Sequence, residues 1–119
     1  MTNAEEITSD ALLAGTALAA IVGTDIWPDE MRQGKKPPAV TFERESSEPE
    51  YSLDNTLHAT KVTMTVTGWA KTRTQALAIA QAAIEALAAV GQVHQSSNAA
   101  YVPELDEYAA VVVFEVWES

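Results

Sequence analysis

The chain has 119 residues, 47% of them hydrophobic, and a formal net charge of −10 at pH 7. The length predicts one domain over residues 1–119, with a hydrophobic core and no room for a second domain. Seven Lys and Arg residues are too few for tight binding to a nucleic-acid backbone, and the absence of cysteine excludes disulfides, thiolate metal sites and cysteine nucleophiles.

The N-terminal region predicts one helix with a single apolar stripe. Asn3 can cap this helix, with Glu6 three residues later, and Gly23 lies where a C-terminal cap belongs. The apolar residues recur at helical spacing: Ile7, Ala11, Ala14, Leu18 and Ile21. The apolar stretch from Ala11 to Val22 is shorter than the ~20 residues that cross a bilayer, and acidic residues precede it. The sequence therefore predicts a cytosolic protein without a membrane span.

A first strand and an acidic connection are expected next. Ile26 to Pro38 is irregular, and the strand from Ala39 to Glu45 follows with apolar residues on one side. Ser46 to Leu57 then reads as a polar, acidic loop. Tyr51 and Leu53 are apolar residues within that loop, so they either tuck against their own core or anchor a neighbouring subunit.

The centre of the chain predicts a half-buried strand that leads almost directly into an alanine-rich helix. The strand covers Ala59 to Ala70 and alternates apolar residues with threonines. The helix covers about Thr72 to Val90 and ends at Gly91. Its apolar arc spans about half the circumference, which is wider than packing on one sheet face needs. The surplus must meet either the first helix, the simpler expectation, or another subunit.

The C-terminal third predicts two more strands. Gln92 to Tyr101 is a weak strand candidate, Pro103 to Glu107 is a polar turn, and Tyr108 to Trp117 is a strand whose continuous apolar run suggests a central position. The order is helix, strand, strand, helix, strand, strand. This predicts an α+β domain with a mostly antiparallel four-stranded sheet and two helices packed on it.

The residues show no catalytic constellation. His58 and His94 are far apart in sequence, and the usual nucleophile and nucleotide-binding motifs are absent. One dense acidic patch stands out: Glu43, Glu45, Glu48, Glu50 and Asp54. That patch is a solvated face, a partner-docking surface or a cation site. We therefore predict a protein that is not an enzyme and holds no cofactor or metal.

An ordered series of short segments resembles the phage tail-completion, or tail-terminator, proteins. The segments cover nearly the whole chain: Leu12 to Gly23, Ile26 to Pro28, Gln33-Gly34, Pro38 to Arg44, Glu50 to Leu53, Val66 to Ala70, Tyr101 to Glu104 and Phe114 to Trp117. Each segment is short, so the specificity lies in their order and spacing.

The resemblance implies a virion structural protein, assembled in the host cytoplasm and located in the tail or neck. Such a subunit forms a ring, expected to be a hexamer, that caps the tail tube and joins it to the head connector. The implied partners are further copies of itself, the tail tube protein and the head–tail connector protein. DNA would pass through an acidic ring without specific binding.

The residues expected to contact a neighbouring subunit or partner lie on the acidic patch and beside it: Glu43, Arg44, Glu48, Glu50, Tyr51 and Leu53. Two alternatives stay open at this point. One is a head-closure or other neck protein of the same particle. The other is a small acidic protein-binding module unrelated to phages, which would dock a basic partner through the same patch.

Overall fold

The computed structural model describes residues 4–23, 26–28, 38–51, 57–96, 99–103 and 106–118, which contain three helices and six strands. In chain order the elements are α1 (Ala4–Ala14), α2 (Thr16–Val22), β1 (Ile26–Pro28), β2 (Ala39–Tyr51), β3 (Leu57–Ala70), α3 (Arg73–Leu87), β4 (Gln92–Ser96), β5 (Ala100–Val102) and β6 (Glu107–Glu118). The α+β class is confirmed. No helix in the described ranges is long and apolar enough to cross a membrane.

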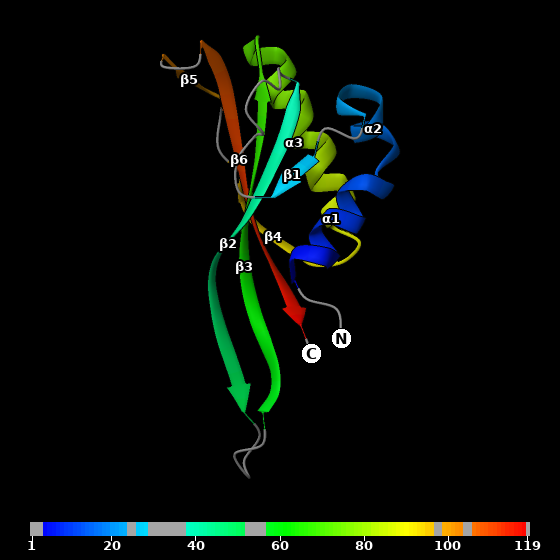
Figure 1. The fold of residues 1–119 in the computed structure, drawn as a ribbon, viewed down its shortest axis with the longest axis vertical. Coiled ribbons are helices and arrows are strands. Elements are labelled where there is room, and N and C mark those ends of the chain that lie inside the picture. The colour runs from blue at the N-terminus through cyan, green and yellow to red at the C-terminus, as the bar shows by residue number, and fades with distance from the viewer. Residues whose placement is uncertain are drawn as a thin grey trace.

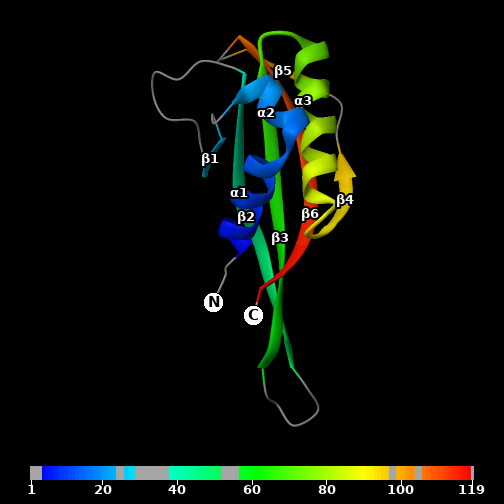
Figure 2. The same cartoon turned by 90° about the vertical axis from the view of Figure 1, so that its right-hand side faces the viewer.

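The strands form one mixed sheet in the order β1-β2-β3-β6-β4, and β5 pairs with β6 beside β4. β1 runs parallel to β2, and every other pairing is antiparallel. The three helices cover one face of this sheet (Figures 1 and 2). The expected four-stranded sheet was therefore too small. β1 and β5 have three residues each, which is too short for a period-two pattern to stand out.

The N-terminal region forms two helices, so the prediction of one continuous helix was wrong. The break is at Gly15, whose extended backbone (φ −72°, ψ 113°) caps α2. A Cβ at this position would lie 2.9 Å from Cβ of Ala86 on α3. The close passage of α3 therefore requires a residue without a side chain, and the chain bends there around α3.

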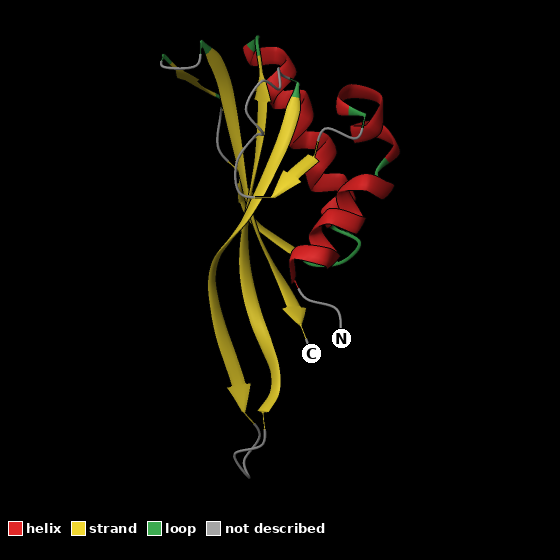
Figure 3. Ribbon diagram, in the orientation of Figure 1, coloured by secondary structure: helices red, strands yellow, loops and turns green. Residues whose placement is uncertain are grey.

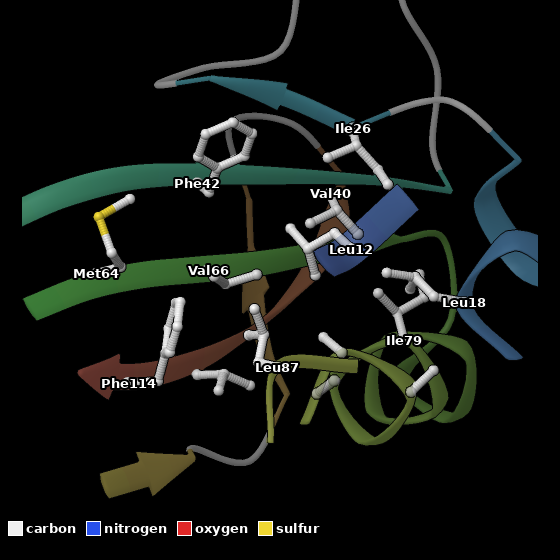
Figure 4. Close-up of a cluster of buried hydrophobic side chains, with 14 of the residues drawn as sticks. Leu12, Leu18, Ile26, Val40, Phe42, Met64, Val66, Ile79, Leu87 and Phe114 are labelled. Carbon is white, nitrogen blue, oxygen red and sulfur yellow. The ribbon is translucent and has the colours of Figure 1, made fainter. Parts of the chain in front are cut away.

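The core lies between the sheet and the helices. Its large, fully buried apolar side chains come from α1, α2, α3, β2, β3 and β6 (Figure 4): Leu12, Leu18, Val40, Val62, Met64, Val66, Ile79, Leu87, Val112, Phe114 and Val116. Helix α3 packs on β3 and β6 and also contacts α1 and α2. The N-terminal helices thus cover part of the wide apolar arc of α3, while Leu77 and Val90 stay exposed.

The β2–β3 hairpin extends beyond the helical layer (Figure 3). The prediction that Ser46 to Leu57 is a loop was wrong for its first part, because β2 continues to Tyr51 and pairs with β3 up to Leu57. Register shifts between Arg44 and Ser46, and between Glu50 and Tyr51, interrupt the ladder. All side chains from Glu43 to Pro49 are exposed. With no buried face, this half of the strand carries no alternation for a sequence pattern to reveal.

Candidate functional site

The exposed half of the β2–β3 hairpin carries most of the residues that were expected to contact a partner. Glu43 and Glu48 are both exposed on β2, opposite Thr65 and Lys61 of β3. Neither carboxylate contributes to the hydrophobic core. The hairpin therefore presents acidic side chains at one end of a molecule whose longest dimension is 52 Å.

Arg44 has an internal role at the base of this hairpin. Its guanidinium forms a bidentate ion pair with Glu5 of α1, with Nη2 2.6 Å and Nε 3.1 Å from Oε1, and Nη2 3.2 Å from Oε2. Both side chains are about one-third exposed (33% and 39%), so solvent weakens the pair. Arg44 thus ties the first turn of α1 to β2, and it positions the hairpin.

Lys61 links three neighbouring strands on the face of the sheet that the helices leave open. Its Nζ lies 3.6 Å from Oε2 of Glu48 on β2 and 3.6 Å from Oε2 of Glu115 on β6. Two same-face positions further along β3, Thr65 donates a hydrogen bond of 2.9 Å from Oγ1 to Oε2 of Glu45. These contacts organise the acidic side chains and offset part of their mutual repulsion.

The open face, as defined by register and side-chain alternation, has three rows. They are mainly the glutamates of β2, the threonines of β3 and the valines of β6. By register the described residues of this face include Glu43, Ser46, Glu48, Lys61, Thr63, Thr65, Thr67, Val111, Val113, Glu115 and Trp117, with Thr41 and Trp69 further along the strands. Glu45 joins them through its hydrogen bond with Thr65. Four carboxylates thus face a single ammonium group. Trp117, opposite Lys61 in the register, is 52% exposed. The face is acidic near the hairpin and more apolar away from it.

A rigid aromatic tip lies at the β5–β6 end of the molecule, far from the hairpin (Figure 1). The ring of Tyr101 packs against Tyr108, with centroids 5.3 Å apart and planes tilted by 57°. The Tyr101 hydroxyl donates a 2.6 Å hydrogen bond to Oδ1 of Asp106. This bond raises the pKa of Tyr101, and burial and the negative charge of Asp106 act in the same direction. Asp106 itself has a left-handed backbone (φ 53°).

A shallow groove of about 390 Å³ lies beside the contact between α3 and the α1–α2 bend. Small side chains line it, with Glu85 at its side: Ala11, Ala14, Gly15, Thr16, Ala17, Ala82, Ala86, Ala89 and Val90. In the part of the chain that the structure describes, no group of three His, Cys, Asp or Glu side chains is placed to hold a metal ion.

The structure brings some of the expected contact residues together and leaves others without a described side chain. Glu43, Arg44 and Glu48 lie on one exposed stretch of β2. Glu50 and Tyr51 continue that strand, and their backbones pair with β3. Leu53 lies outside the described residues.

Sequence reasoning missed Lys61, Trp117 and Tyr101. Lys61 and Trp117 meet only through the β3–β6 pairing, which separates them by many residues along the chain. A motif search could not have found that contact. Tyr101 did carry a local signal, because Asp106 follows it by five residues across a turn.

Comparison with known proteins finds a matching family model and a solved structure with a similar fold. A family model described as tail completion protein gp17 matches residues 9–119. A chain from the structure entitled "Virion of native gene transfer agent (GTA) particle" superposes with a TM-score of 0.68 at 20% sequence identity, covering 93% of this chain and 90% of that one. At this identity the match shows a shared fold. A search of curated protein sequences finds no match.

Proposed function

This chain belongs to the tail completion protein gp17 family and is a structural protein of the virion tail and neck; from that premise we propose that it forms a ring that caps the tail tube and joins it to the head connector. The proposal treats residues 1–119 as one domain and the ring as a hexamer of identical copies. Its action is stereospecific docking without chemical turnover.

The hairpin is the observation that carries this proposal. Its β2 side chains from Glu43 to Pro49 are exposed and lie outside the core, so their acidic character is free to serve contact with a partner. Up to Thr60 this stretch belongs to a three-stranded part of the sheet that includes β6, and beyond Thr60, among the described residues, only β2 and β3 pair. A two-stranded end of that kind is weakly stable alone, and packing against a partner would add order to it. We assign the partner contact to Glu43, Glu48, Glu50, Tyr51 and Leu53, with Arg44 holding the base in place.

The mode of contact follows from the edge of β2. Beyond the short β1 pairing, this edge carries exposed glutamates, Pro49 and two register shifts. Charges, proline and irregularities are the devices by which natural sheets block edge-to-edge strand addition. Side chains, rather than a shared ladder of backbone hydrogen bonds, would therefore make the contact, and a basic partner surface would complement them.

The open face supports a passage for DNA. Its Glu43, Glu45, Glu48 and Glu115 carboxylates outnumber the one ammonium group of Lys61. A polyanion is repelled by such a surface rather than retained on it. A ring whose lumen carries the part of this face that the partner leaves uncovered would let DNA slide through without specific binding.

Electron microscopy of the protein with tail tubes tests the proposal. We expect ring-shaped density with six-fold symmetry at one end of each tube, and light scattering then gives the number of copies. A head-closure protein, the second candidate role, would bind the connector and leave tubes bare. A protein that binds neither tubes nor connectors, at concentrations where the tubes stay intact, would contradict the proposal.

A further inference from the structure

The exposed tyrosine at the β5–β6 end is the feature that the proposed ring does not yet explain. Most large apolar side chains in the described ranges are buried, but Tyr101 is 49% exposed. Two contacts nevertheless fix its ring: the packing against Tyr108 and the hydrogen bond to Asp106. An aromatic side chain that is both exposed and held in place loses little entropy on binding, which is typical of residues that dominate interface energetics.

The backbone of Asp106 is also held by a hydrogen bond. The Asp106 N–H donates a 3.3 Å hydrogen bond to the carbonyl of Pro103, and its backbone is left-handed, a conformation that Asp and Asn tolerate better than most residues. The carboxylate is exposed and accepts the tyrosine hydroxyl on Oδ1. Oδ2 has no partner in the described residues and stays open to an incoming group.

The chemistry of the tip selects a particular kind of ligand. Because the Tyr101 hydroxyl is already bonded within the chain, the tip offers an aromatic ring and a carboxylate side by side. A planar guanidinium can stack on such a ring while its N–H groups pair with the carboxylate. A lysine ammonium, as a compact and strongly hydrated charge, matches the pair of groups less well.

We propose that Tyr101 and Asp106 form a docking point for an arginine side chain of a partner protein. The tip and the β2–β3 hairpin lie at opposite ends of the long axis (Figure 1). If the proposed ring is correct, the arginine belongs to whichever neighbouring component meets the end away from the hairpin. The docking point itself does not depend on that assignment, since it rests on Tyr101, Tyr108 and Asp106 alone.

The test is a titration of ¹⁵N-labelled protein, followed by transverse-relaxation-optimised NMR. The two probes are the blocked peptides acetyl-Gly-Arg-Gly-amide and acetyl-Gly-Lys-Gly-amide. We expect the arginine peptide to shift the amide signals of residues 101 and 106–108. It should bind about fivefold more tightly there than the lysine peptide, because only the planar guanidinium can stack on the ring and pair with the carboxylate at the same time. Equal shifts with both peptides, or shifts centred on Glu43 to Glu48, would overturn the proposal.

Three variants separate the contribution of the ring from that of the charge. Tyr101→Leu removes the aromatic face and Asp106→Asn removes the charge while keeping a residue that accepts φ 53°; each should weaken binding of the arginine peptide about fivefold. Tyr101→Phe keeps the ring and frees Oδ1, so its affinity should equal or exceed that of the wild type.

A Tyr101→Phe variant that binds as poorly as Tyr101→Leu would contradict the proposal. If Tyr101→Leu fails to fold, the peptide affinities of Asp106→Asn and Tyr101→Phe still test the proposal. Light scattering on the same samples reports ring formation separately. A failure of the proposed function would therefore be recognised independently of the peptide result.

Discussion

The helix-covered half of the sheet and the projecting half of the β2–β3 hairpin both contain β2 and β3, but the two halves have different roles. In the covered half, Phe42 and Val66 are register partners in a core whose side chains are almost fully buried. In the projecting half, every β2 side chain from Glu43 to Pro49 is exposed. One long strand thus supports folding at its start and presents a surface at its end.

The transition between the two halves is local. It coincides with the register shift between Arg44 and Ser46, and with the ion pair from Arg44 to Glu5 on α1. A register irregularity bends a strand and increases its twist. The comparison teaches that substitutions in the buried part of β2, up to Phe42, should change the free energy of unfolding, and that substitutions of the exposed glutamates from Glu43 onward should change assembly.

The largest effect should come from two neighbouring residues of β6 that lie on opposite faces. Phe114 is fully buried against the helical layer, whereas Val113 lies half-buried on the open face. We expect Phe114→Ala to lower the free energy of unfolding by about 3–5 kcal/mol, and Val113→Ala to lower it by only about 1 kcal/mol. Urea denaturation measures both. Equal losses would mean that the open face is covered in the isolated protein.

A smaller loss should follow from filling the close contact between β3 and α3. A Cβ at Gly68 would lie 2.6 Å from Cγ2 of Ile79. We expect Gly68→Ala to cost about 1–3 kcal/mol through overpacking. Ile79→Ala removes the clashing atom, so the double variant should lose less than the sum of the two single variants. Additive losses would contradict this close packing.

The ion pair at the base of the hairpin should contribute less again. Glu5 and Arg44 are each about one-third exposed, so a double-mutant cycle with Glu5→Gln and Arg44→Gln should give a coupling energy of about 0.2–1 kcal/mol. High salt should reduce it. A coupling energy above about 2 kcal/mol is typical of charge-assisted hydrogen bonds that are shielded from water. Such a value would contradict the view that this ion pair is a solvent-exposed contact at the edge of the core.

The tyrosine at the far end should make the smallest of these contributions, and that contribution is present in full at neutral pH. The Asp106 hydrogen bond raises the pKa of Tyr101 in the folded state. A raised pKa stabilises the fold fully below the ordinary tyrosine value of about 10, and that stabilisation is lost as the pH rises through the folded-state pKa. Asp106→Asn should therefore lower the pKa of Tyr101, as measured from tyrosinate absorbance. An unchanged titration would show that the hydrogen bond is absent in solution.

Much of the covered half could be predicted from the sequence, because burial leaves a periodic pattern. The alternation of Val62, Met64 and Val66 predicted β3, and the alanine-rich spacing after Thr72 predicted α3; both lie where they were expected. The break at Gly15 could not be predicted, because its cause is the approach of Ala86 from a distant part of the chain.

The projecting half was harder to predict for the same physical reason. Ser46 to Pro49 has no buried face, so its polar composition resembled a loop. Its acidic character was visible, but the internal pairing of Arg44 with Glu5 and of Glu48 with Lys61 depends on tertiary contacts. The acidic composition of the sequence therefore indicated where the candidate surface lies. The structure was needed to show which of its described side chains pair within the chain and which point to solvent without such a pair.

The most direct test of the division between folding and docking is to measure both stability and tube capping on a hairpin double variant and on a control double variant. Glu43→Lys with Glu48→Lys reverses two exposed charges of the hairpin, and Lys71→Glu with Arg73→Glu makes a matched reversal on exposed residues beside the start of α3. The midpoint of urea unfolding and the fraction of tail tubes that carry a terminal ring are measured for both. We predict that the hairpin variant unfolds at the wild-type midpoint, within about 0.5 kcal/mol, and leaves tubes uncapped, while the control variant still caps them. A hairpin variant that caps tubes as well as the wild type would contradict the account.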